Sequence, residues 1–200
     1  MPYRATGTPM RKKPAGTVRI IGGKWRGTRL PVRDIPGLRP SGDRGRETLF
    51  NWLQLHIRGA SCADLFAGSG VLGLEAASRG ASRVVLVEKS KPAAEDIRES
   101  VSRLNAVGVD VVRGDALDWL AGCEPESLDI VFIDPPFGSG LETRALELLT
   151  SGSCVRKGGF VYLETARDEP VGMPGPAWET VKETVMGEVR YRLIRAREVF

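Results

Sequence analysis

The sequence predicts a doubly wound α/β fold, in which a parallel sheet is covered by helices on both faces. Two observations predict the sheet: short segments that are apolar along their whole length, such as RVVLVE at Arg83–Glu88, and segments of helical character between them. A third observation is a glycine-rich turn between the first such strand and the helix after it. We expect an antiparallel hairpin at the C-terminal end and a small β-hairpin extension at the N-terminal end.

The N-terminal part divides into an expected tail, an extension and the start of the main domain. Residues 1–16 are rich in Pro, Gly, Lys and Arg and are expected to form a disordered basic tail. Residues 17–42 contain two short β-type runs, Val18–Ile21 and Thr28–Val32, which predict a hairpin. Residues 43–200 form the expected main domain, which starts with a helix because RETLFNWLQLHI has apolar residues at helical spacing.

Strand-like and helix-like segments then alternate through the main domain. Pro92 starts one helix, while Gly80 and Gly108 each follow the end of one. The expected parallel strands are Cys62–Phe66, Arg83–Glu88, Val109–Asp115, Leu128–Asp134 and Gly158–Glu164, and the C-terminal pair is Trp178–Met186 and Val189–Ala196. The expected helices are Gly70–Arg79, Lys91–Asn105, a short one through Trp119 and one from Leu141.

Composition excludes several classes of protein. Hydrophobic residues make up 42% and charged residues 27% of the chain, and no apolar run approaches the roughly 20 residues that span a bilayer. With no secretory signal in the N-terminal segment, we expect a cytoplasmic globular protein. Cys62, Cys123 and Cys154 are widely spaced and His56 is the single histidine, so neither a disulfide framework nor a metal site is expected.

The charge is distributed unevenly along the chain. Residues 1–60 contain 13 Lys and Arg against 3 Asp and Glu, whereas residues 61–200 contain 16 against 22. A basic arm before an acidic body indicates a polyanion as partner, because Lys and Arg displace the counterions condensed on phosphates. Composition alone leaves open a basic tail that is merely solvated.

The segment DLFAGSGVLG places Gly68, Gly70 and Gly73 at the spacing G-x-G-x-x-G, between a strand and a helix. The backbone must turn sharply there and approach a ligand closely, which a Cβ would obstruct. Glu88 ends the next strand, where a carboxylate can accept hydrogen bonds from ribose hydroxyls. The pattern predicts a nucleoside-containing cofactor bound by Phe66, Ala67, Gly68, Ser69, Gly70, Glu88 and Lys89.

Four acidic residues end successive predicted strands: Asp64, Glu88, Asp115 and Asp134. Ligands of open α/β sheets bind at the carboxyl ends of the strands, so the four carboxylates should line one crevice. Asp64 would repel a pyrophosphate but suits an ammonium and a sulfonium group. Asp115 can accept the adenine amine, with Ala116 beside it. The acids therefore favour S-adenosylmethionine as the cofactor.

The loop Asp134–Phe137 offers mainly hydrogen-bond acceptors, because Pro135 and Pro136 have no N–H. The Asp134 carboxylate and the Pro135 carbonyl can accept both hydrogens of an exocyclic amine on a nucleobase, which favours a nitrogen with its lone pair available for attack. Phe137 can stack on the base, which contributes about 1–3 kcal/mol. We therefore predict that Asp134, Pro135, Pro136 and Phe137 are the catalytic residues of an in-line methyl transfer to an amine that requires no metal.

These motifs resemble those of a known family. DPPF resembles the (D/N)PP(F/Y/W) motif of methyltransferases that modify exocyclic amines, and VRIIGGKWRGTRLPV, LRPSGDRGRETLFNWL and DLFAGSGVLGLEAASRGA resemble the bacterial 16S ribosomal RNA guanine-N2 methyltransferases of the RsmD family. The resemblance implies a Rossmann-like class I methyltransferase sheet, S-adenosylmethionine as cofactor, and a guanine of 16S rRNA as substrate. We expect a monomer that acts on the rRNA within a 30S subunit or an assembly intermediate, although the sequence does not distinguish naked rRNA from an assembled particle.

The same resemblance implies that the N-terminal hairpin docks the RNA. Where the family pattern is close to RPTTDRVRE, this chain has RPSGDRGRE, and the added Gly42 and Gly45 are expected to lower the order of the loop. The RNA-binding residues that follow from the resemblance are Lys24, Arg26, Arg29, Arg39, Arg44 and Arg46. The last three would either contact RNA or order the loop over the site.

The residues alone leave other functions open, since spacing and composition do not tell guanine from adenine or RNA from DNA. A DNA adenine or cytosine amino methyltransferase would share the acceptor loop. A nicotinamide-dependent oxidoreductase would use the glycine loop, but Asp134–Phe137 would then have no explanation. A catalytically silent RNA-binding protein with the same fold would not need the strand-end acids.

Overall fold

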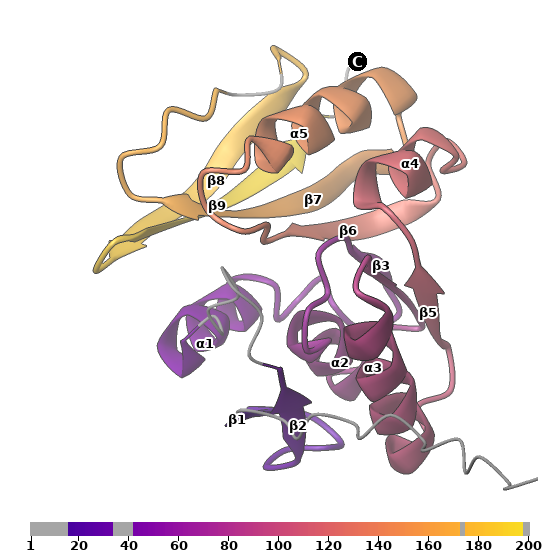
Figure 1. Ribbon diagram of the computed structural model, residues 1–200. Helices are drawn as coiled ribbons and strands as arrows, with labels where there is room; N and C mark the ends of the chain where they lie inside the picture. Colours follow the sequence, from indigo (N-terminus) through magenta and orange to yellow (C-terminus); the bar gives the residue numbers. More distant parts are fainter. Residues whose placement is uncertain (1–15, 34–41, 173–174, 198–200) are drawn as a thin grey trace, which may run out of the picture.

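The computed structural model describes residues 16–33, 42–172 and 175–197 (Figure 1). The predicted basic tail, residues 1–16, lies outside the described residues except for Gly16, which starts the first strand. Arg39 also lies outside the described residues. No helix of the described part is both long and apolar enough to cross a membrane.

The described residues form one seven-stranded sheet in the order β5-β4-β3-β6-β7-β9-β8. Strands β3 to β7 run parallel, and β9 joins the edge of β7 antiparallel, with β8 outside it. The order reverses beside β3, which is the arrangement of a doubly wound sheet. The strands are β3 (Ser61–Asp64), β4 (Arg83–Glu88), β5 (Val109–Arg113), β6 (Leu128–Ile133), β7 (Val155–Ala166), β8 (Trp178–Met186) and β9 (Val189–Ala196).

Helices cover both faces of the sheet, as the sequence predicts (Figure 1). One face packs against α1 (Asp43–Trp52), α2 (Val71–Ser78) and α3 (Lys91–Leu104), and the other packs against α4 (Ala116–Ala121) and α5 (Leu141–Gly152). The expected fold class is therefore confirmed. Several predicted bounds are off by one or two residues. The larger differences are that α1 ends before the apolar periodicity does, and that β7 begins three residues before the predicted Gly158, next to an irregularity in its pairing with β6.

The N-terminal extension is a two-stranded antiparallel hairpin, β1 (Gly16–Arg19) and β2 (Arg29–Val32). It forms a sheet of its own, but its apolar side chains belong to the same hydrophobic core as α1, α2 and one face of the main sheet. Burial of these side chains fixes the hairpin against the main domain, because separating the two would expose apolar area to water. They are Val18, Ile20, Leu30 and Val32.

Candidate active site

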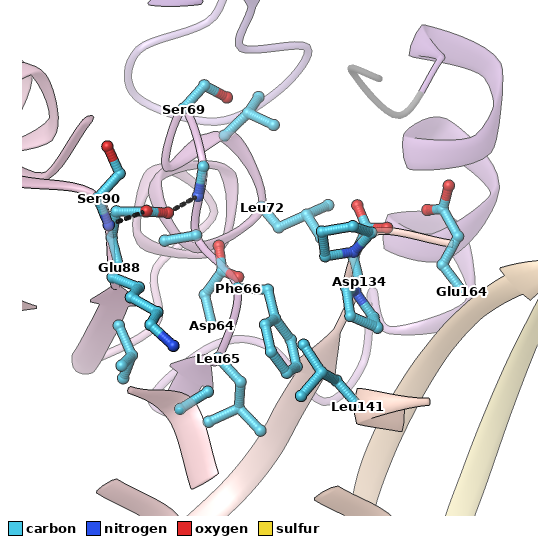
Figure 2. A pocket seen from close by; sticks show the side chains of 18 of the residues that line it. Asp64, Leu65, Phe66, Ser69, Leu72, Glu88, Ser90, Asp134, Leu141 and Glu164 are labelled. Carbon is cyan, nitrogen blue, oxygen red and sulfur yellow. Dashed lines mark hydrogen bonds between the residues drawn. The ribbon is translucent and has the colours of Figure 1, made fainter. Parts of the chain in front are cut away.

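A cavity of about 790 Å³ lies at the carboxyl ends of the parallel strands (Figure 2). It brings together the four strand-end acids that the sequence predicts to share one crevice. Gly70 does not line the cavity; it precedes α2 with φ 76°, a left-handed conformation that suits glycine. The predicted site residues that do line it are Asp64, Phe66, Ala67, Gly68, Ser69, Glu88, Lys89, Asp115, Ala116, Asp134, Pro135, Pro136 and Phe137.

The glycine loop closes tightly around the carboxylate of Glu88. Glu88 accepts hydrogen bonds from the backbone N–H groups of Gly68, at 2.8 Å, and Ser90, at 2.7 Å (Figure 2). Burial raises the pKa of Glu88, and these backbone hydrogen bonds oppose that rise. Gly73 serves packing, since a Cβ there would lie 2.2 Å from Cδ2 of Leu86. The loop thus holds Glu88 at the cavity edge, where it can meet a ribose.

Asp64 is a buried carboxylate with one uncompensated oxygen. Asp64 is only 1% exposed, and its Oδ2 accepts the N–H of Gly73 at 3.0 Å. Its Oδ1 is buried without a hydrogen-bond partner among the described residues. Burial, together with the charges of Asp134 and Glu88, raises the pKa of Asp64 to about 7. A cation or an N–H donor in the cavity would compensate Oδ1, so this site fits the ammonium and sulfonium groups of S-adenosylmethionine.

Asp115 caps the N-terminus of α4 and accepts the N–H of Leu117 at 2.9 Å. Its other oxygen accepts from Nζ of Lys89 at 3.1 Å, and this hydrogen bond is the main cause that lowers the pKa of Asp115. The carboxylate is therefore an ionised acceptor at the cavity rim. Lys89, which the sequence predicts as a cofactor residue, lines the cavity with its Nζ on Asp115.

The acceptor loop begins where β6 ends, directly beside β3. Leu65 N donates to the carbonyl of Phe132 at 3.1 Å, which holds the two strands together at the cavity. Pro135 is buried, whereas Phe137 is 39% exposed on the rim of the cavity. An aromatic ring that is both exposed and adjacent to an acceptor surface suits a base that enters from solvent.

The sequence does not predict the place of Glu164 on β7 or of Tyr191 on β9, which both line the cavity. They are Cα partners across the two strands, and Glu164 accepts the hydroxyl of Tyr162 at 3.0 Å. The signal for Glu164 was available, since it lies near the end of a predicted parallel strand like the other acids. Tyr191 gives no such signal, because its place depends on β9 pairing with β7 rather than only with β8.

The predicted RNA-binding residues divide into two groups. Lys24, Arg26, Arg29 and Arg44 are exposed. Arg46 is fully buried, so the prediction that it contacts RNA is wrong: its Nη1 donates to the carbonyl of Arg19 at 2.8 Å, and its guanidinium pairs with Asp43 and Glu75. The physical reason is the buried carboxylate of Glu75, which needs a cation nearby.

Glu75 in α2 holds the hairpin to the main domain. Its two carboxylate oxygens accept the backbone N–H groups of Ile21, at 2.6 Å, and Gly22, at 2.7 Å, and Nε of Arg79 donates at 2.8 Å. Ser78 adds two contacts, because its Oγ accepts from Trp25 N at 2.9 Å and donates to the Gly22 carbonyl at 2.6 Å. The loop that carries Lys24 and Arg26 is thereby fixed in place.

Within residues 16–33, 42–172 and 175–197, no group of three or more His, Cys, Asp or Glu is arranged to hold a metal ion. The three cysteines are free thiols, of which Cys62 and Cys154 are buried.

Comparison with known proteins matches nearly the whole chain. The family model described as conserved hypothetical protein 95 matches residues 18–195. The ribosomal RNA small subunit methyltransferase D of Haemophilus influenzae is 42% identical over 183 residues, covering 89% of this chain and 93% of that protein. The protein of the same name from Escherichia coli is 42% identical over 186 residues, covering 91% and 93%. Among solved structures, a putative methyltransferase of Escherichia coli, yhhF, superimposes with a TM-score of 0.84 at 39% identity, covering 91% of this chain and 99% of that one.

Proposed function

The chain belongs to the conserved hypothetical protein 95 family, with ribosomal RNA small subunit methyltransferase D among its relatives, and we propose that it methylates the exocyclic N2 amine of a guanine in 16S rRNA. It is an S-adenosylmethionine-dependent rRNA methyltransferase. One observation carries the assignment: the uncompensated Oδ1 of Asp64 and the acceptor loop Asp134–Phe137 lie in the same cavity. The first suits a cationic cofactor, and the second suits an amine.

Different residues of the cavity would bind different groups of the cofactor. Asp64 would face the positive charge, Glu88 the ribose hydroxyls, and Asp115 with Ala116 the adenine. S-adenosylmethionine, when bound, supplies an electrophilic methyl group on a sulfonium centre. The half-buried Phe66 lies in the cavity wall between Asp64 and Leu141, where it can exclude water (Figure 2).

The acceptor loop prepares the amine. The Asp134 carboxylate and the Pro135 carbonyl accept its two hydrogens, which directs the nitrogen lone pair toward the methyl group. Phe137 stacks on the base and holds it in line, and alignment of this kind can lower a barrier by about 7–11 kcal/mol. Asp134 then stabilises the positive charge that develops on the nitrogen and accepts the proton that the methylated amine releases.

The exposed cations of the hairpin support a large RNA substrate. Lys24, Arg26 and Arg29 can bind phosphates without regard to sequence, while the cavity takes one base. Because the N2 amine lies on the Watson–Crick edge, the target guanine must be unpaired or flipped out. We extend the proposal to a monomer that acts in the cytoplasm on the 30S subunit or an assembly intermediate.

The test is methyl transfer from radiolabelled S-adenosylmethionine to 30S particles that lack the modification, followed by nuclease digestion and identification of the labelled nucleoside. We expect label in N2-methylguanosine. Label in N6-methyladenosine, or transfer to DNA and not to rRNA, would contradict the proposal. The same assay without enzyme, and with Lys157→Glu as a variant remote from the cavity, provides the controls.

A further inference from the structure

Glu164 is a buried carboxylate in the cavity wall that the transfer mechanism above does not use. It is 4% exposed and accepts the hydroxyl of Tyr162 at 3.0 Å. A carboxylate has about four lone-pair sites, so it can accept further hydrogen bonds beside this one. A donor on the substrate is therefore a chemically suitable partner.

Glu164 lies next to Asp134. Ile133 and Leu163 are Cα partners in the parallel pairing of β6 with β7; Glu164 is the next residue on β7, and Asp134 directly follows the end of β6. Because paired parallel strands lie about 4.8 Å apart, the two residues leave this pair side by side. Figure 2 shows the side chains of Asp134 and Glu164 beside each other, with their carboxylates pointing in the same direction. Burial first, and then the charges of Glu164 and Asp134, raise the pKa of Tyr191 to about 12, which reflects the same proximity.

Nucleobases differ at the ring atom beside the exocyclic amine. In guanine the N2 amine lies beside N1–H, which is a hydrogen-bond donor. In adenine the amine lies beside N1, and in cytosine beside N3, and each of these atoms presents a lone pair. Enzymes that flip a base out read it through hydrogen bonds to this edge. A second carboxylate beside the amine-binding one therefore meets a donor only when the base is guanine.

We propose that Glu164 is a specificity-determining residue, which accepts N1–H of the target guanine while Asp134 and Pro135 hold its N2 amine. The inference rests on the proposed function and names the group that selects its base. The Tyr162 hydroxyl donates to the carboxylate and orients it. A carboxylate oxygen is an acceptor and repels a ring-nitrogen lone pair, so adenine and cytosine are disfavoured at the same position.

The experiment compares guanine with 2-aminopurine, which keeps the 2-amine and lacks the N1 hydrogen. Once the labelled guanine is mapped, 30S particles are reconstituted with 2-aminopurine at that position. The wild-type enzyme is expected to favour guanine by at least about 100-fold in kcat/KM. In Glu164→Gln the activity on guanine is expected to fall. The ratio of kcat/KM for guanine to that for 2-aminopurine is expected to fall by about 10-fold or more, because the amide can donate to N1 of 2-aminopurine. The missing O6 of 2-aminopurine affects both enzymes alike, so the change in preference reports residue 164.

Glu142→Gln is the matched control, since Glu142 is also a buried glutamate, 3% exposed, but lies outside the cavity. It should keep the wild-type preference. Calorimetric affinity for S-adenosylmethionine should be unchanged in Glu164→Gln. If this variant does not fold, Tyr162→Phe, which removes the orienting hydroxyl, should still narrow the preference. Loss of activity with an unchanged preference overturns the inference alone, whereas a wild-type enzyme that labels no guanine overturns the proposed function as well.

Discussion

The ring of Tyr191 occupies the space that a side chain at Gly45 would need: a Cβ on Gly45 would lie 2.8 Å from Cε1, Cζ and Oη of that ring. Gly45 lies within α1, and Tyr191 is on β9 with its ring stacked against Tyr162, the two centroids 6.4 Å apart. Gly45, one of the glycines that depart from the family pattern, therefore makes room for an aromatic wall of the cavity and does not lie in a loop.

Gly45→Ala is expected to destabilise the protein. Overpacking against Tyr191 costs about 1–3 kcal/mol, while alanine in a helix gains about 1 kcal/mol over glycine, so we expect a net loss of about 1 kcal/mol. In a Tyr191→Ala background the same change should stabilise the fold. Urea unfolding of the four proteins measures the cycle, and an equal effect in both backgrounds would show that the contact is not responsible.

Arg46→Ala should cost far more stability than Arg44→Ala. Arg46 is buried and holds the carbonyl of Arg19 and the carboxylates of Asp43 and Glu75, so its loss breaks a buried ion pair and removes the donor to the Arg19 carbonyl, at about 3–5 kcal/mol. Arg44 is exposed and its loss should change the free energy of unfolding by less than about 0.5 kcal/mol. Thermal unfolding of both variants checks this, and similar midpoints would refute the buried role of Arg46.

Asp64 should make the empty protein less stable as the pH rises. Burial raises its pKa from 3.8 to about 7, so between these values the folded protein retains a proton that the unfolded chain has released. Stability from this group therefore falls between about pH 4 and pH 7, by an amount on the order of 2–4 kcal/mol. Asp64→Asn should lack this slope. Urea unfolding at pH 5 and pH 8, without cofactor, measures the difference between the two proteins.

The affinity of the protein for S-adenosylmethionine should rise with pH over the range in which Asp64 makes the free protein less stable. A cation beside Asp64 favours the ionised carboxylate, so binding to the wild type should tighten as the pH rises through about 7, with release of a proton. Asp64→Asn should bind more weakly and with less dependence on pH. Calorimetry in two buffers of different ionisation enthalpy detects the released proton, and its absence would mean that Asp64 does not face the positive charge.

Asp134→Ala should abolish methyl transfer and leave the affinity for S-adenosylmethionine nearly unchanged. The carboxylate contacts the amine in the proposed reaction, and removal of one preorganised electrostatic group lowers kcat by about 100- to 1000-fold. Single-turnover transfer and equilibrium binding are measured on the same preparation. Equal losses in transfer and in cofactor affinity would reassign Asp134 to the cofactor.

Reversal of charge in the hairpin should weaken RNA binding and leave the affinity for S-adenosylmethionine unchanged. Lys24→Glu with Arg26→Glu removes two exposed cations, so the affinity for rRNA should fall and its salt dependence should become shallower by roughly 0.7 per lost phosphate contact. Lys157→Glu, an exposed lysine near the start of β7, is the control. Filter binding at several salt concentrations measures both, and equal effects of the two changes would indicate that net charge rather than the hairpin matters.

The fold could be predicted where local patterns decide it. The apolar run Arg83–Glu88 and the C-terminal strands Trp178–Met186 and Val189–Ala196 have the bounds that the sequence indicates. The burial of Arg46 could not be predicted, because it depends on Glu75, which lies in another helix. Tyr191 enters the cavity only through the pairing of β9 with β7, a long-range contact that no local pattern reports.

Helix α2 connects the cofactor side of the cavity with the N-terminal hairpin. Near its start, the N–H of Gly73 holds Asp64 in the cavity, and near its end Glu75 and Ser78 hold the hairpin. Its 8 residues, at 1.5 Å each, form a rigid helix about 12 Å long. In the proposed reaction, this helix would therefore fix the distance between the phosphates that the hairpin binds and the guanine that the cavity binds. Selection among guanines would then depend on the three-dimensional shape of the RNA, and a one-residue insertion in α2 would change the separation that is accepted.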